Sequence, residues 1–122
     1  MIYGIGIDAV QIERIKKATQ RWQDRFLLRI FTKAEIAYCQ EKVLPYQHLA
    51  GRFAAKEAVI KAIGIGWPIF SLTDIEILSS FGPPEVRLNN KAERIVREKG
   101  ISHILVSISH TDGRAEAIAI CQ

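Results

Sequence analysis

The strongest constraint on the fold of this chain is segment 46–63, which is apolar almost all round when it is drawn as a helix. Leucine, phenylalanine and isoleucine share one face, and alanines at every fourth position from Ala50 to Ala62 cover most of another. A helix without a polar face belongs in a core or between subunits. We therefore expect a long central helix that follows Pro45 and is closed by Gly64.

Four charged side chains interrupt this apolar segment: Arg52, Lys56, Glu57 and Lys61. An unpaired buried charge costs on the order of several kcal/mol, so these groups need partners. Glu57 and Lys61 lie four residues apart and can form a structural ion pair, with lysine stems that reach solvent. Two positive charges would still lack a local partner, and a polyanion such as a diphosphate would neutralise them. With a second carboxylate, Glu57 could instead hold a divalent cation that phosphates also contact.

The candidate for the second carboxylate is Asp8, which ends the apolar segment 2–8. This segment is β-branched and alternating and predicts a short strand. Gly4 and Gly6 weaken the strand and let another backbone or a ligand approach closely. An aspartate here is also a good cap for a following helix, which is the alternative explanation. Asp8 and Glu57 together would supply enough protein ligands for Mg²⁺, because this ion uses one or two carboxylates plus phosphates and water.

Positive charge is concentrated near the N-terminus. The whole chain has 17 Lys and Arg against 13 Asp and Glu, whereas segment 11–33 alone has seven basic and two acidic side chains. The sequence predicts a broken helical region over about residues 10–30. If the segment is helical, the bases that would align along one side are Arg14, Lys17, Arg21, Arg25 and Arg29. The apolar residues expected on its buried side are Ile12, Ile15, Trp22, Phe26 and Ile30. Both a solvated amphipathic face and a docking strip for an acidic protein, a nucleic acid or a membrane surface explain the pattern.

The remaining segments predict an α+β fold with mainly antiparallel strands. Thr32 and Glu35 form a capping-box pattern, so a helix should begin there. Turn 111–114 contains Asp-Gly and predicts a hairpin. The other predicted elements are strands 73–79, 84–88, 103–109 and 115–121 and helix 90–99. We expect one domain over residues 1–122, with the sheet packed against the long helix.

Composition and cysteine usage exclude several protein classes. The chain is 48% hydrophobic and 25% charged, which excludes disordered and collagen-like proteins. Its two cysteines, Cys39 and Cys121, have no metal-binding spacing, so we expect a reduced, cytoplasmic protein. The N-terminal segment lacks a basic region and stops being apolar at Asp8, which argues against a signal peptide or a membrane span.

A third polar cluster, Ser107 to Asp112, lies at the end of a predicted strand. Adjacent serine, histidine and aspartate do not make a catalytic triad, and no G-x-S-x-G motif accompanies them. His110 is explained by a structural role, by donation to a phosphate or by pairing with Asp112. Segment 64–66, Gly-Ile-Gly, lacks the Lys-Ser/Thr of a phosphate loop and follows a helix, so we exclude a nucleotide P-loop.

Five blocks in order along the chain carry a family resemblance: Gly4–Asp8, Ile12–Arg14, Phe31–Glu35, Arg52–Ala62 and Ser107–His110. Together they resemble the holo-acyl-carrier-protein synthase family, the short trimeric phosphopantetheinyl transferases, over nearly the whole chain. The resemblance implies Mg²⁺-dependent transfer of 4'-phosphopantetheine from coenzyme A to a serine of acyl carrier protein. This step of fatty acid biosynthesis releases adenosine 3',5'-bisphosphate.

The resemblance also implies roles for individual residues. Asp8 and Glu57 match the metal ligands. Glu57, directly or through a metal-bound water, would take the serine proton, and Lys61 would stabilise the departing phosphate. The residues that match coenzyme A contacts are Arg52, Lys61, His110 and Thr111. The docking site for acyl carrier protein corresponds to Arg14, Arg21 and Arg25.

The family forms homotrimers with sites between neighbouring subunits, and it implies no nucleic-acid or membrane partner. This chain departs from its pattern at Ile65, where a hydroxyl residue is usual, and at loop 81–84, which commonly carries a basic residue. We expect any coenzyme A contacts there to be fewer or made by the main chain. A small nucleic-acid-binding protein and a non-catalytic coenzyme A binder are the rival hypotheses. Only the enzyme would add a phosphopantetheine mass to acyl carrier protein.

Overall fold

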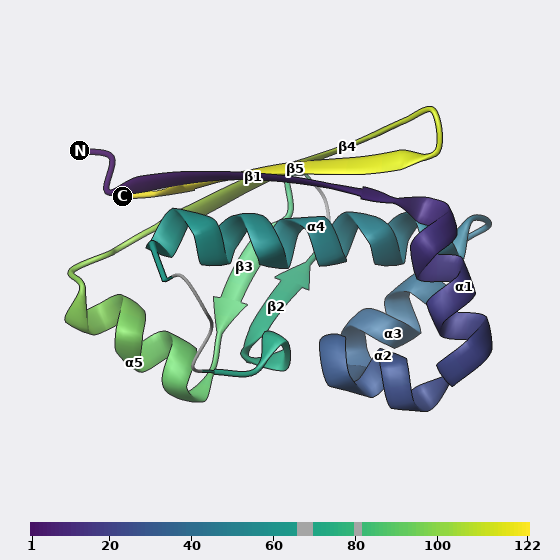
Figure 1. Cartoon of the computed structure of the whole chain (residues 1–122). Coiled ribbons are helices and arrows are strands. Elements are labelled where there is room, and N and C mark those ends of the chain that lie inside the picture. Colours follow the sequence, from purple (N-terminus) through teal and green to yellow (C-terminus); the bar gives the residue numbers. More distant parts are fainter. Residues whose placement is uncertain (66–69, 80–81) are drawn as a thin grey trace.

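The computed structural model describes residues 1–65, 70–79 and 82–122, and these form an α+β fold around one long helix (Figure 1). The elements in chain order are β1 (Gly4–Gln11), α1 (Ile12–Trp22), α2 (Asp24–Ile30), α3 (Lys33–Gln40), α4 (Pro45–Ile63), the 3₁₀ turn η1 (Leu72–Asp74), β2 (Ile75–Leu78), β3 (Glu85–Leu88), α5 (Asn90–Glu98), β4 (Ile104–Thr111) and β5 (Arg114–Cys121). Strands β1, β5 and β4 form an antiparallel sheet in that order, and β2 pairs with β3 in a second antiparallel sheet. The predicted fold class is confirmed.

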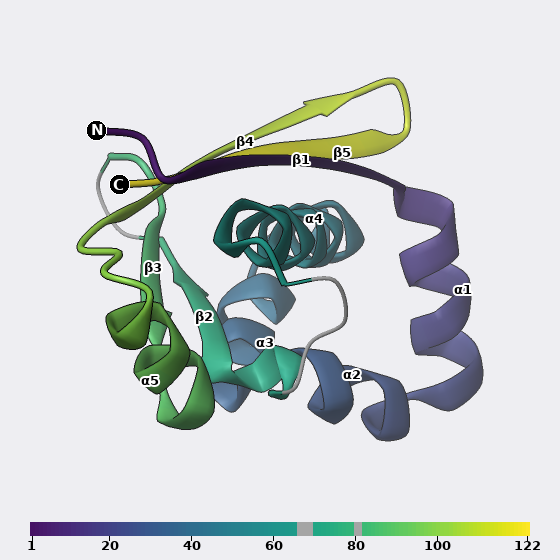
Figure 2. The same cartoon turned by 60° about the vertical axis from the view of Figure 1, so that its left-hand side comes forward.

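Helix α4 lies at the centre of the molecule, with the three-stranded sheet over one side and α1, α3 and β2 around the others (Figure 2). Pro45 stands in its first turn, where a missing N–H costs no hydrogen bond. Gly64 ends it in the left-handed conformation with a φ of 87°. Most of its side chains are buried, as expected for a helix without a polar face.

Strand β1 crosses α4 at very close range because of its two glycines. A Cβ at Gly4 would collide with the carbonyl oxygen of Ala62, and one at Gly6 with that of Ala58. Glycine in a strand permits such an approach of two backbones. The crossing brings Asp8, farther along β1, to the side of the same helix.

No described element covers the opposite face of the three-stranded sheet (Figures 1 and 2), and one end of this face is apolar. Cross-strand rows on this face run from apolar to polar: Ile5, Ile120 and Leu105; then Ile7, Ile118 and Ser107; then Ala9, Glu116 and Ser109. The side chains of Ile5 and Ile7 are 61% and 67% exposed. Such a contiguous exposed patch is typical of an interaction surface.

A buried ion pair lies on the side of α4 away from this sheet. The Nζ of Lys56 is 2.7 Å from Oε1 of Glu35, and both side chains are fully buried. Lys56 also donates to the carbonyl oxygens of Leu72 and Ile75. Burial lowers the pKa of Lys56, and the charge of Glu35 opposes that change. Lys56 therefore has a partner from a distant segment, so one of the two cations expected to lack a local partner is neutralised inside the core.

Glu35 is at the same time part of the predicted capping box. Its Oε1 accepts from the backbone N–H of Thr32, and its own N–H donates to the Thr32 hydroxyl. Its Oε2 accepts from the N–H of Ile77 at 2.9 Å. One carboxylate thus joins the start of α3 to α4 and to strand β2.

The basic segment departs from the expected single face. Gln23 has a φ of 49° and a ψ of −127°, so α1 ends there and α2 starts in a new direction. Ile15 is buried as expected, but Trp22 is 47% exposed, so its assignment to the buried side was wrong. The position of Trp22 at the end of α1, next to the break, explains this difference. Strand β1 also extends past Asp8 to Gln11, because it pairs with β5 as far as Arg114.

Candidate active site

Asp8 lies inside strand β1, on the sheet face that packs against α4, opposite Ala117 of β5. It does not cap a helix, because α1 begins at Ile12 with Gln11 in the capping position. The Nζ of Lys61 is 3.2 Å from its Oδ1 and also donates to the carbonyl oxygen of Ile7 at 2.9 Å. The first strand and the central helix therefore meet at an ion pair.

Glu57 lies one turn before Lys61 on α4 and is half-buried. Burial raises its pKa, the negative charge of Asp8 raises it further, and Lys61 opposes both. Lys61 forms its ion pair with Asp8, and in the described part of the chain Glu57 has no ion pair at contact distance. Two carboxylates and one ammonium thus share one site between β1 and α4.

The oxygen donors of this site suit a hard divalent cation. Mg²⁺ takes one or two carboxylates and completes its shell with substrate phosphates and water. Among residues 1–65, 70–79 and 82–122, no group of three or more histidine, cysteine, aspartate or glutamate side chains is arranged to hold a metal. The two carboxylates of Asp8 and Glu57 are oxygen donors of the kind that Mg²⁺ takes, and a divalent cation would relieve their mutual repulsion.

Arg52 lies elsewhere on α4 and is only 3% exposed. Its Nη2 donates to Oγ of Ser79 at 2.9 Å, and its guanidinium lies 4.3 Å from the centre of the Tyr38 ring. Its Nε has no hydrogen-bond partner, and no carboxylate of the described residues pairs with it. Arg52 is thus a buried cation without an anion, which is an expensive arrangement unless a ligand completes it.

His110 lies near the end of β4 and contacts the first turns of α4. Its Nε2 is 3.1 Å from the carbonyl oxygen of Gln47 at the start of α4. Gly51 permits this contact, because a Cβ there would lie 3.0 Å from the same nitrogen. Thr111 follows His110 and is exposed. The hairpin end therefore lies against the first turns of α4.

Arg52 and Lys61 lie on opposite sides of α4. Positions 52 and 61 differ by nine residues, which at about 100° per residue is close to half a turn. Lys61 contacts β1, whereas Arg52 contacts Tyr38 of α3 and the residue that follows β2. Within one chain the structure brings Asp8, Glu57 and Lys61 together, but it does not bring them to Arg52.

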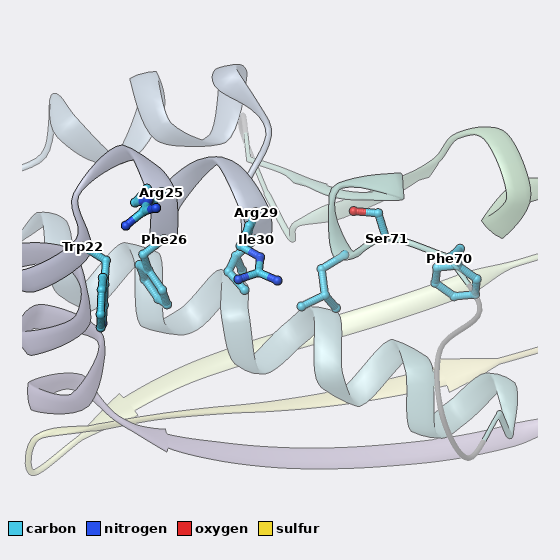
Figure 3. A pocket seen from close by; sticks show the side chains of 8 residues that line it. Trp22, Arg25, Phe26, Arg29, Ile30, Phe70 and Ser71 are labelled. Atoms are coloured by element: carbon cyan, nitrogen blue, oxygen red, sulfur yellow. The ribbon is translucent and has the colours of Figure 1, made fainter.

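The three predicted docking residues, Arg14, Arg21 and Arg25, are exposed on α1 and α2. Arg25 also lines a groove of about 870 Å³. Figure 3 shows its lining, which consists of Trp22, Arg25, Phe26, Arg29, Ile30, Phe70, Ser71 and Leu72. The sequence did not indicate this groove. It combines the unexpectedly exposed Trp22 with segment 70–72, which follows almost fifty residues later.

Ile65 and loop 81–84 are the two places where the sequence predicts fewer coenzyme A contacts than in the family. Ile65 is half-buried and packs against the core, whereas Gly66 and Phe81 lie outside the described residues. Sequence reasoning also missed Tyr38 and His48, which surround Arg52 and His110. An aromatic residue in a short helix carries no local signal of such a role.

None of the helices in the described part is long and apolar enough to cross a membrane.

Comparisons with known proteins show the family of this chain. Residues 4–121 match the model of the 4'-phosphopantetheinyl transferase superfamily. A holo-acyl-carrier-protein synthase of Caldanaerobacter subterraneus subsp. tengcongensis is 47% identical over 117 residues, which cover 95% of this chain and 91% of the relative.

Two solved structures are also similar. The crystal structure of holo-acyl-carrier-protein synthase from Neisseria meningitidis has a TM-score of 0.91 and 34% identity, and covers 100% of this chain and 99% of its own. The crystal structure of the Helicobacter pylori synthase in complex with coenzyme A has a TM-score of 0.84 and 35% identity. It covers 97% of this chain and 99% of its own. With its carboxylate pair beside a lysine on the central helix, the chain belongs to the 4'-phosphopantetheinyl transferase superfamily.

Proposed function

We propose that this chain is a holo-acyl-carrier-protein synthase, which transfers 4'-phosphopantetheine from coenzyme A to a serine of acyl carrier protein. The observation that carries the proposal is the pair Asp8 and Glu57 beside Lys61. Relatives with this name align along almost the whole chain, and one similar structure contains coenzyme A. In the transfer, the serine oxygen forms a bond to phosphorus, and the diphosphate bond breaks to release adenosine 3',5'-bisphosphate.

Asp8 and Glu57 are the residues that would hold Mg²⁺. A bound Mg²⁺ would supply positive charge next to the diphosphate oxygens, where negative charge develops during phosphoryl transfer. Asp8 would keep its carboxylate on the sheet side of the site and Glu57 on the helix side. Two acids on separate elements hold a fixed geometry because the glycines of β1 bring the strand against α4.

Glu57 is also the candidate base for the serine proton. A glutamate whose pKa is raised by burial and by a neighbouring acid is a stronger base than an exposed one. Lys61 would stabilise the negative charge on the departing phosphate. In the structure its ammonium already lies between the strand and the helix, 3.2 Å from Asp8, and its side chain is 55% exposed, so it can turn toward a substrate.

The coenzyme A site is proposed to lie between subunits of a homotrimer. Arg52 lies across α4 from Lys61, and His110 contacts the first turns of that helix, far from Lys61 along its length, so one coenzyme A molecule would contact both groups most simply if they came from neighbouring chains. The uncovered apolar face of the β1–β5–β4 sheet supports self-association, because a patch of this kind is unfavourable in water.

Acyl carrier protein is proposed to dock on α1 and α2. Arg14, Arg21 and Arg25 supply exposed positive charge for an acidic helix, which would raise the association rate. The adjoining groove, with Trp22 and Phe26 in its wall, would take apolar side chains of that helix (Figure 3).

A cytoplasmic location stays a prediction, supported by two cysteines that are buried and free.

A mass measurement tests the function directly. Apo-acyl carrier protein incubated with the protein, coenzyme A and Mg²⁺ should gain the mass of one phosphopantetheine group. Glu57→Gln and Asp8→Asn should each abolish this gain while the circular dichroism spectrum stays that of the wild type. Near-normal turnover in either variant would exclude the assigned carboxylates, and no mass gain with the wild type would exclude the function.

A charge-reversal experiment tests the docking site. Arg14→Glu together with Arg21→Glu should raise the KM for acyl carrier protein by about tenfold or more and leave the KM for coenzyme A unchanged. Arg97→Glu on α5, which is equally exposed, serves as the matched control. An equal loss of coenzyme A affinity would contradict docking on α1.

A further inference from the structure

His48 stands in the middle of the aromatic and cationic cluster around Arg52. Its ring packs edge-on against Tyr38 of α3 on one side and against His110 of β4 on the other, with 6.1 Å between ring centres in each case. It lies one turn before Arg52 on α4, and its carbonyl oxygen accepts from Nη1 of that arginine. Residues of α3, α4 and β4 thus meet at His48, which has no role in the proposed function described above.

The titratable and charged groups that face His48 are all basic. Arg52 comes from its own helix, Lys42 from the segment after α3, and His110 from β4. The ammonium of Lys42 and the guanidinium of Arg52 lie 4.4 Å and 4.3 Å from the centre of the Tyr38 ring. Burial lowers the pKa of His48, and these three neighbours lower it further. No carboxylate among the described residues counters them there.

This cluster lacks an anion. A buried arginine with an unpartnered Nε, next to a lysine and two histidines, is stabilised by a ligand with negative charge. The inference rests on the proposed function, in which that ligand is coenzyme A. Coenzyme A carries a diphosphate, which belongs with Asp8, Glu57 and Lys61, and one phosphomonoester. The second pKa of a phosphomonoester is about 6, so this group is a dianion at neutral pH.

We propose that His48 is a further binding residue for the phosphomonoester of coenzyme A, and that it takes up a proton from solvent when that dianion binds. No covalent bond changes in this step. The neutral imidazole of the free protein gains one proton and becomes a charged donor. The cost of placing this charge beside Arg52 and Lys42 is offset by the two negative charges of the ligand.

Calorimetric binding at pH 7.5, in two buffers with different ionisation enthalpies, measures the proton uptake. Coenzyme A should bind the wild type with uptake of a substantial fraction of one proton per site. Dephospho-coenzyme A, which lacks only the phosphomonoester, should bind with none. His48→Gln should lose the uptake and bind coenzyme A about tenfold more weakly, while its affinity for dephospho-coenzyme A stays unchanged.

The other two histidines are the controls. His103→Gln makes the same chemical change at an exposed position and should behave as the wild type. His110→Gln should weaken binding but retain the uptake. Proton uptake that persists in His48→Gln, or disappears in His110→Gln instead, would overturn the proposal, as would equal uptake with dephospho-coenzyme A.

A nuclear magnetic resonance titration of the wild type tests the proposal even if the His48→Gln variant does not fold. In the wild type, the ring proton signal of His48 should move to the charged position on addition of coenzyme A at pH 7.5. A signal that stays at the neutral position contradicts the proposal. If the wild type binds coenzyme A with proton uptake but transfers no phosphopantetheine, only the proposed function is contradicted. If the wild type does not bind coenzyme A, both the proposed function and the role of His48 are contradicted.

Discussion

The carboxyl group of Glu57 combines two effects that disfavour its negative charge, burial first and the neighbouring Asp8 second. Asp8→Asn removes the second effect, so we predict that the pKa of Glu57 falls but stays above its ordinary value. Carbon-13 titration of the Glu57 carboxyl in the metal-free protein measures it. A folded-state pKa that is raised means that stability decreases as pH rises through it, and this decrease should be smaller in Asp8→Asn. An unchanged Glu57 titration would mean that the two acids do not interact.

At the scale of elements, the buried pair of Lys56 and Glu35 holds α3, α4 and β2 together. Lys56→Met leaves the Glu35 carboxylate buried without its cation, and we predict a loss of about 3–5 kcal/mol in the free energy of unfolding. Urea unfolding measures this loss. Arg97→Met breaks an exposed ion pair with Glu93 and should cost less than about 0.5 kcal/mol. Similar losses in the two variants would contradict the structural role of the buried pair.

The crossing of β1 and α4 gives a second prediction at this scale. Gly6→Ala places a methyl group against the carbonyl oxygen of Ala58, so the strand must move away from the helix. We predict a loss of about 3 kcal/mol in stability and a larger fall in kcat than in coenzyme A affinity, because Asp8 moves with the strand. Urea unfolding and steady-state kinetics measure both. A fully active and stable variant would contradict the close crossing.

For the whole molecule, we predict that the uncovered sheet face mediates the proposed self-association. Ile7→Glu puts a charge in the middle of this apolar face, and we predict a monomer that retains the fold but transfers little phosphopantetheine, because it lacks a neighbour's Arg52 and His110. Analytical ultracentrifugation measures the mass. Leu28→Glu, at a residue that is 50% exposed on α2, should leave the assembly unchanged. A monomeric wild type with full activity would contradict a site between subunits.

Local signals were sufficient for most elements of this chain. The predicted strand 73–79 was wrong at its start, because Leu72–Asp74 form a 3₁₀ turn and β2 begins at Ile75. The Thr32–Glu35 box, the left-handed Gly64 and the turn through Asp112 and Gly113 all occur as predicted, because each depends on hydrogen bonds and backbone angles within a few residues. The amphipathic reading failed only at the α1–α2 break, where Trp22 is exposed. A change of helix direction alters which face is buried, and periodicity within one segment does not reveal it.

The sequence by itself determined the central helix, the antiparallel hairpin and the acids that the chemistry needs, because these depend on residue type and short-range spacing. The tertiary structure alone decided which charges meet. Lys61 contacts Asp8, and Lys56 finds Glu35 inside the core. Arg52 is buried on the far side of the helix, and no carboxylate in the described part of the chain forms an ion pair with it. These outcomes depend on contacts between segments far apart in the chain, where burial and Coulomb energy, and not local preference, select the partner.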